Sequence, residues 1–171
     1  GKSLLISVIL VGGAWIGWNF YQDQQRQTGE AAAAMYSALA DKASLVQQGQ
    51  GSDADRTEAV ALASDLKKNF AGSTYAGFAS LYLARFAADA GDMDAAATEL
   101  QGLLKTAEPP FSYMATLRLA AVLTEQGKYD EAIALVSKSA DKAYASQYHE
   151  ARGDALLLKG AKADARKAYL E

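Results

Sequence analysis

The stretch LAAVLTEQGKYDEAIALV, residues 119–136, contains the pattern that decides the fold. Gly127 stands between two runs in which apolar residues recur every three or four positions, as they do on one face of an α-helix. The small side chain of Ala132 would let two helix backbones cross closely, while the glycine permits the turn between them. The stretch therefore predicts a pair of antiparallel helices.

The same spacing occurs three times in the chain. An alanine follows each of three glycines after five residues, in the pairs Gly91 with Ala96, Gly127 with Ala132, and Gly160 with Ala165. The repeat lengths are 36 and 33 residues, and such a period is typical of tetratricopeptide repeats. The third copy is weaker, because Lys162 takes the place of Tyr129. We therefore expect an all-α fold, a right-handed solenoid of tetratricopeptide-like helical hairpins.

Glycine and proline positions divide the chain beyond residue 22 into eight predicted helices. Ser52 with Asp55 has the spacing of a capping box, and Asp92 or Asp94 could cap another helix. The expected helices span residues 30–48, 53–70, 74–90, 93–106, 111–126, 129–141, 145–159 and 162–170. The first two lack a repeat signature and are expected to form a degenerate hairpin that caps the stack.

Residues 3–21, SLLISVILVGGAWIGWNFY, carry no charge. A helix of this length can cross a hydrocarbon layer of about 30 Å, and the aromatic residues at its C-terminal end favour the headgroup region. A cleaved signal peptide would have a shorter apolar stretch and small residues at its exit. We therefore predict a single transmembrane anchor over residues 1–22, a linker with the degenerate hairpin over 23–73, and the repeats over 74–171.

Four residues of this segment are predicted to contact other membrane helices. Gly13 and Gly17 lie four residues apart on one helix face, which would let a second helix approach closely. Trp15 and Trp18 accompany them near the predicted membrane exit. Glycine is also common in membrane helices in general, so the pair fits either interpretation.

Composition argues against catalysis and against nucleic-acid binding. The chain has 17 Lys and Arg, 20 Asp and Glu, one histidine and no cysteine, so its surface is mildly acidic and lacks thiolates. His149 has no serine, carboxylate or metal partner at a suggestive spacing, and helix capping explains the acidic group Asp53, Asp55 and Glu58. We expect no enzymatic activity, cofactor or metal. A hydrolase site using His149 and Glu150 is the enzymatic alternative.

The repeat register predicts a partner-binding groove. In the tetratricopeptide fold that the chain resembles, the first helix of each hairpin faces a concave surface. The side chains predicted to line it are Phe78, Leu81, Arg85, Asp89, Met114, Leu117, Thr124, Glu125, Gln147, Glu150 and Asp154. This mixed apolar and acidic lining suits an extended polypeptide better than a small rigid metabolite, although it also fits solvated helix faces. The aromatic stripe Tyr75, Phe78, Tyr82 and Phe86 is expected to be core, except at Phe78.

Three segments carry a more specific resemblance. They are GAWIGWNFY at residues 13–21, TYAGFASLYLARF at 74–86 and ARGDALLLKGAKADARKAY at 151–169. With the anchor, the atypical first hairpin and the repeats, they make the chain similar to the family of ancillary SecYEG translocon subunits, which are single-pass proteins of the bacterial inner membrane. The likeness covers nearly the whole chain.

The resemblance implies location and partners. It implies a cytoplasmic N-terminus and a periplasmic helical domain. It also implies association with the Sec translocon and with a membrane-anchored, prolyl-isomerase-like periplasmic chaperone, and secretory polypeptides are a further expected partner. The expected function is a non-enzymatic scaffold that brings these partners together. The alternative is a tetratricopeptide adaptor for outer-membrane or cell-wall assembly complexes.

Overall fold

The computed structural model of the chain describes residues 2–138 and 141–171, with side chains described at Trp15 and from Trp18 onward. These residues form eight helices and no strand, which confirms the predicted all-α fold. The helices are α1 (Lys2–Gln47), α2 (Asp53–Asn69), α3 (Thr74–Asp89), α4 (Met93–Leu104), α5 (Phe111–Glu125), α6 (Tyr129–Val136), α7 (Ala145–Lys159) and α8 (Lys162–Ala168).

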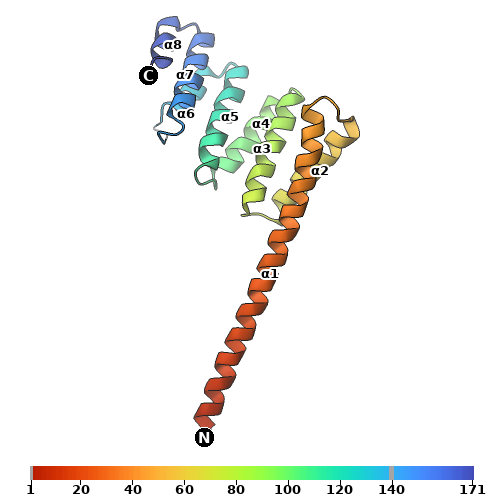
Figure 1. Ribbon diagram of the computed structural model, residues 1–171. Coiled ribbons are helices and arrows are strands. Elements are labelled where there is room, and N and C mark those ends of the chain that lie inside the picture. The colour runs from red at the N-terminus through yellow and green to blue at the C-terminus, as the bar shows by residue number, and fades with distance from the viewer. Residues whose placement is uncertain (1, 139–140) are drawn as a thin grey trace.

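The helices pair into four hairpins that stack side by side (Figure 1). Each odd-numbered helix packs against the even-numbered helix that follows it, and α1, α3, α5 and α7 also contact one another in that order. The odd-numbered helices therefore share one side of the stack. The N-terminal half of α1 projects away from the stack as a single rod (Figure 1).

The predicted helices from α2 onward agree with the structure to within a few residues, except that α6 ends at Val136 and not at residue 141. The linker expected at residues 23–29, between the anchor segment over 1–22 and the helix expected over 30–48, is not observed. One helix of 46 residues runs through this interval. The reason is local, because residues 22–29 contain no proline and only one glycine, Gly29, among residues that tolerate a helix well.

The hairpin turns follow the sequence signals. Gly91, Gly127 and Gly160 have φ values of 82°, 73° and 92°, a left-handed conformation that L side chains rarely adopt. The predicted capping box is confirmed, since the Ser52 hydroxyl accepts from the Asp55 backbone N–H while the Asp55 carboxylate accepts from the Ser52 backbone N–H. Asp92 caps α4 by accepting from the backbone N–H of Ala95.

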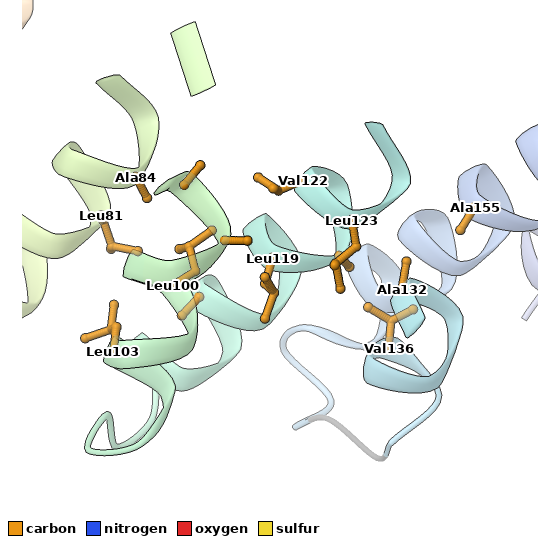
Figure 2. Packing of buried hydrophobic residues seen from close by; sticks show 14 of the residues in the cluster. Leu81, Ala84, Leu100, Leu103, Leu119, Val122, Leu123, Ala132, Val136 and Ala155 are labelled. Carbon is orange, nitrogen blue, oxygen red and sulfur yellow. The ribbon is translucent and has the colours of Figure 1, made fainter. Parts of the chain in front are cut away.

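The core is built around small residues at the helix crossings. The three repeat alanines, Ala96, Ala132 and Ala165, are at most 1% exposed. A larger core runs from α3 to α7, and Figure 2 shows its leucines and valines filling the space beside the alanines. A second core joins the C-terminal half of α1 to α2 and α3. The stack is therefore continuous from α1 to α8.

Because Ala132 has no free space around it, a larger side chain there would force the α5–α6 hairpin apart. We expect Ala132→Leu to lower the free energy of unfolding by about 1–3 kcal/mol. Ala134→Leu is the matched control, since Ala134 is exposed on the same helix, and its effect should stay within about 0.5 kcal/mol. Urea denaturation followed by circular dichroism measures both. Equal stabilities for the two variants would contradict the packing argument.

Candidate partner-binding surface

The odd-numbered helices carry the residues predicted to line a groove. Phe78, Met114, Leu117 and Thr124 are half-buried, while Arg85, Asp89, Glu125, Gln147, Glu150 and Asp154 are exposed or partly so. Leu81 was wrongly predicted to line the surface. It is only 3% exposed and belongs to the core of α3 to α7, because α5 packs directly against α3. The other predicted residues remain accessible to a partner.

An aromatic cluster connects three of the odd-numbered helices. The Phe78 ring lies 5.3 Å from Tyr36 of α1 and 4.8 Å from Phe111 of α5, measured between ring centroids. Tyr36 also approaches Tyr75 and Tyr82, at 5.4 and 6.5 Å. Aromatic pairs at such distances stabilise beyond their buried area. The cluster therefore fixes the first three odd-numbered helices relative to one another.

Sequence reasoning found only part of this cluster. Phe86 is buried as expected, whereas Tyr75 and Tyr82 are less buried than a core position requires. Tyr36 and Phe111 were missed. No repeat register reaches Tyr36, and Phe111 directly follows the Pro109-Pro110 loop signal, so it was assigned only to a helix start. The aromatic character of Phe111, directly after that loop, was the one sequence signal that could have indicated its place in the cluster.

The charges on this side of the stack have both signs, and several already have partners within the chain. Arg85 Nε lies 3.6 Å from Asp89 Oδ2. The guanidinium of Arg118 donates to the Leu81 carbonyl oxygen at 3.4 Å, and partial burial, together with nearby Arg85, lowers the pKa of Arg118. Mixed charges of this kind favour an amphipathic partner over a strongly charged one.

Asp154 at the C-terminal end is also engaged. The Tyr169 hydroxyl donates to Asp154 Oδ1 at 2.6 Å, and this hydrogen bond, helped by burial, raises the pKa of Tyr169 to about 12. The Tyr169 ring occupies the space where a side chain at Gly153 would lie. Asp154 therefore helps to hold the last hairpin together, and its role in a groove stays a prediction.

The acidic group at the start of α2 is structural. Lys42 Nζ lies 2.7 Å from Asp55 Oδ1 and 2.8 Å from Glu58 Oε2, which ties α1 to α2. Hydrogen bonds from Lys42, and then from Ser52, lower the pKa of Asp55, while those to Asp55 and Glu58 raise the pKa of Lys42. Asp55 thus caps α2, as the capping interpretation predicted, and the contacts of Asp55 and Glu58 with Lys42 add a clamp between α1 and α2.

His149 is the histidine on which the enzymatic alternative depends. Its Nδ1 lies 3.1 Å from a carboxylate oxygen of Glu171, and its side chain is half-buried on α7. Within the described part of the chain, no group of three or more His, Asp and Glu side chains is arranged to hold a metal ion. The neighbouring Glu150 is exposed.

The predicted membrane contacts lie on the projecting part of α1. Trp15 and Trp18 are 66% and 61% exposed, and Phe20 and Tyr21 are similarly open. Gly13, Gly17 and most other residues of the predicted span at 3–21 lie outside the part of the chain whose side chains the structure describes. Among the residues that the structure describes, no helix combines the length and the apolar character needed to cross a membrane.

Comparison with known proteins places the chain in a family. The family model described as a tetratricopeptide repeat-like domain matches residues 1–171. The Escherichia coli K12 protein named ancillary SecYEG translocon subunit is 32% identical over 170 residues, which cover 99% of this chain and 78% of that protein. Proteins of the same name from Haemophilus influenzae and Neisseria gonorrhoeae are 27% and 28% identical, over 99% of this chain and 79% and 78% of their own lengths.

The stacked hairpins and this match define a tetratricopeptide repeat-like protein. Similarity over 99% of the chain then identifies it as a member of the family of ancillary SecYEG translocon subunits. The resemblance carried by the three sequence segments is thereby confirmed.

The Asp55 clamp gives the protein a pH dependence. Since the pKa of Asp55 is lower in the folded protein than in the unfolded chain, its ionised form stabilises the fold fully above a pH of about 4, and this contribution is lost as the pH falls further.

We expect Asp55→Asn to lower the melting temperature at pH 7, with the difference in melting temperature from the parent protein narrowing toward pH 2. Thermal melts over that range test this. Asp65→Asn, at an exposed position of the same helix, is the control. A gap that stayed constant with pH would count against the clamp.

Proposed function

We propose that the protein is a non-enzymatic scaffold, anchored in the bacterial inner membrane and associated with the Sec translocon. Its 32% identity, over 99% of the chain, to a protein named ancillary SecYEG translocon subunit is the observation that carries the proposal. The continuous stack of hairpins supports it, because stacked helical repeats provide an extended surface for other proteins. The function is docking, without chemistry.

The anchor is residues 3–21, with the N-terminus in the cytoplasm and the repeats in the periplasm. The uncharged sequence and the exposed rings of Trp15, Trp18, Phe20 and Tyr21 support this placement. Gly13 and Gly17 would bring another membrane helix close to the span. We assign the contact with the translocon to this helix.

The unbroken course of α1 sets how the repeats stand relative to the membrane. Its first buried residue after the aromatic end is Ala32. At ~1.5 Å per residue, Tyr21 and Ala32 lie roughly 16 Å apart along the helix axis. A rigid helix of this length would keep the stack near the translocon exit. Confinement to such a layer raises the effective concentration of bound partners.

The groove side of α3, α5 and α7 is assigned to a periplasmic partner. The prolyl-isomerase-like chaperone and emerging secretory polypeptides are the proposed occupants. Half-buried apolar residues, Phe78, Met114 and Leu117, alternate with charged residues on this side. Such a surface binds extended or amphipathic polypeptides through apolar contacts with a polar rim. The scaffold would thus bring a secretory polypeptide that leaves the translocon close to a folding factor.

Affinity purification from solubilised membranes tests the assignment. We expect Met114→Gln to reduce recovery of the periplasmic partner about tenfold, the effect of losing about 1.4 kcal/mol of binding free energy. Recovery of translocon components through the span should not change. Met93→Gln is the matched control, because Met93 is also half-buried against the same core but lies on α4.

Two results would contradict the proposal. One is an equal loss of the periplasmic partner with the Met114 and Met93 variants, which would show that the partner does not bind specifically to the groove side. The other is recovery of outer-membrane or cell-wall assembly proteins without any Sec component, which would favour the adaptor alternative.

A further inference from the structure

A cleft opens at the turn edge of the stack, beside the α2–α3 turn and the α4–α5 loop. Its volume is about 710 Å³. The lining residues that matter here are Gly77, Ser80, Gly102, Thr106 and Phe111. None of them belongs to the predicted groove. The volume is within the range of sites that hold peptides or small ligands.

The cleft lies where the repeat carries a glycine in place of an aromatic residue. Gly77 and Tyr113 occupy the same place, 14 residues before Gly91 and Gly127, and Phe111 corresponds to Tyr144 in the next repeat. At the next seam the rings of Tyr113 and Tyr144 pack with centroids 5.0 Å apart. At the first seam, a Cβ on Gly77 would already lie 3.4 Å from the Phe111 ring. The Phe111 ring therefore packs directly against Gly77 and forms one wall of the cleft.

A hydroxyl group from a largely buried residue lines the cleft. Ser80 is 4% exposed and lines the cleft. Thr116, its equivalent in the next repeat, satisfies its hydroxyl by donating to the Ser112 carbonyl oxygen at 2.8 Å. Ser80 Oγ makes no hydrogen bond to any described residue. Because Ser80 lines the cleft, this hydroxyl is available to donate to or accept from a bound molecule.

The other polar groups show which ligand fits. The rim carries one ammonium group, Lys67, and one carboxylate, Glu108, and Lys67 already pairs with Glu99. A charged ligand of either sign would therefore gain little electrostatic binding energy from this rim. Hydroxyl groups such as those of Ser80 and Thr106 both donate and accept, as the peptide group requires. The remaining walls are largely apolar, with Leu103, Phe111 and several alanines.

We propose that this cleft binds an uncharged, extended stretch of polypeptide, which places an apolar side chain against Phe111 and pairs its backbone with Ser80. Phe111 also packs against Phe78, so the bound segment would lie close to the aromatic cluster without using the groove residues. The site adds a second polypeptide contact to the protein and does not depend on the proposed translocon association.

Gly102 provides a direct test. A Cβ at Gly102 meets nothing within 4 Å, so Gly102→Leu fills part of the cleft, and leucine favours the helix more than glycine does. Gly29→Leu is the matched control, since Gly29 is likewise helical with nothing within 4 Å of a Cβ. The full chain in nanodiscs is titrated into a fluorescein-labelled nonapeptide of alternating serine and leucine, acetylated and amidated, and fluorescence anisotropy is recorded.

We expect saturable binding with a Kd of about 10–100 µM, typical of a short flexible peptide. Gly102→Leu should raise the Kd at least tenfold, Ser80→Ala about threefold to tenfold, and Gly29→Leu not at all. Absence of binding to the parent protein, or equal Kd values for the two leucine variants, would overturn the proposal.

A second arm distinguishes a polypeptide site from a lipid site. Titration with a fluorescent fatty acid tests whether the cleft holds an acyl chain. Tight binding of the fatty acid that displaces the peptide would contradict the polypeptide proposal and identify the cleft as a lipid site. Copurification of translocon components with Gly102→Leu should equal that of the parent protein. If Gly102→Leu loses peptide binding but still copurifies with the translocon, the result tests the cleft and leaves the proposed function untouched. If the parent protein fails to copurify with the translocon, the proposed function is contradicted and the cleft proposal is unaffected.

Discussion

The whole structure depends on the close approach of two helix backbones at an alanine. Ala96, Ala132 and Ala165 each occupy a crossing point with at most 1% of their surface exposed. A methyl group is the largest side chain that such a crossing accepts, and the leucines and valines around it then reach their partners (Figure 2). Because the constraint repeats every 33 to 36 residues, the last three hairpins turn at equivalent positions, and each stacks on the one before.

Stacking produces the features on which function depends. It gathers the odd-numbered helices on one side, where half-buried apolar residues and charges alternate. It joins α1 to the stack through the Tyr36 aromatic contacts and the Lys42 clamp, so the helix that begins near the predicted membrane segment is part of the array. At the seam where Gly77 stands in the repeat position of Tyr113, a cleft opens beside Phe111.

Much of the fold could be predicted from the sequence, because turn glycines, caps and helical periodicity are local signals. Those signals located Gly91, Gly127 and Gly160 at turns and Ser52 at a helix start. The site was less predictable. Leu81 follows the groove register, yet α5 buries it, and Tyr36 meets Phe78 across 42 positions of sequence that no repeat links. Contacts between hairpins depend on how each pair stacks, which periodicity does not specify.

Site-specific photocrosslinking in intact membranes tests most directly whether this stack is a scaffold at the translocon. A photoreactive residue is placed in turn at Trp18, Phe78, Met114 and Gln147, and the trapped proteins are identified by mass spectrometry. Our account predicts translocon adducts from Trp18, and adducts to a periplasmic folding factor or to secretory chains from the other three positions. Adducts only to cell-wall or outer-membrane assembly proteins, with translocon components absent from every position, would contradict it.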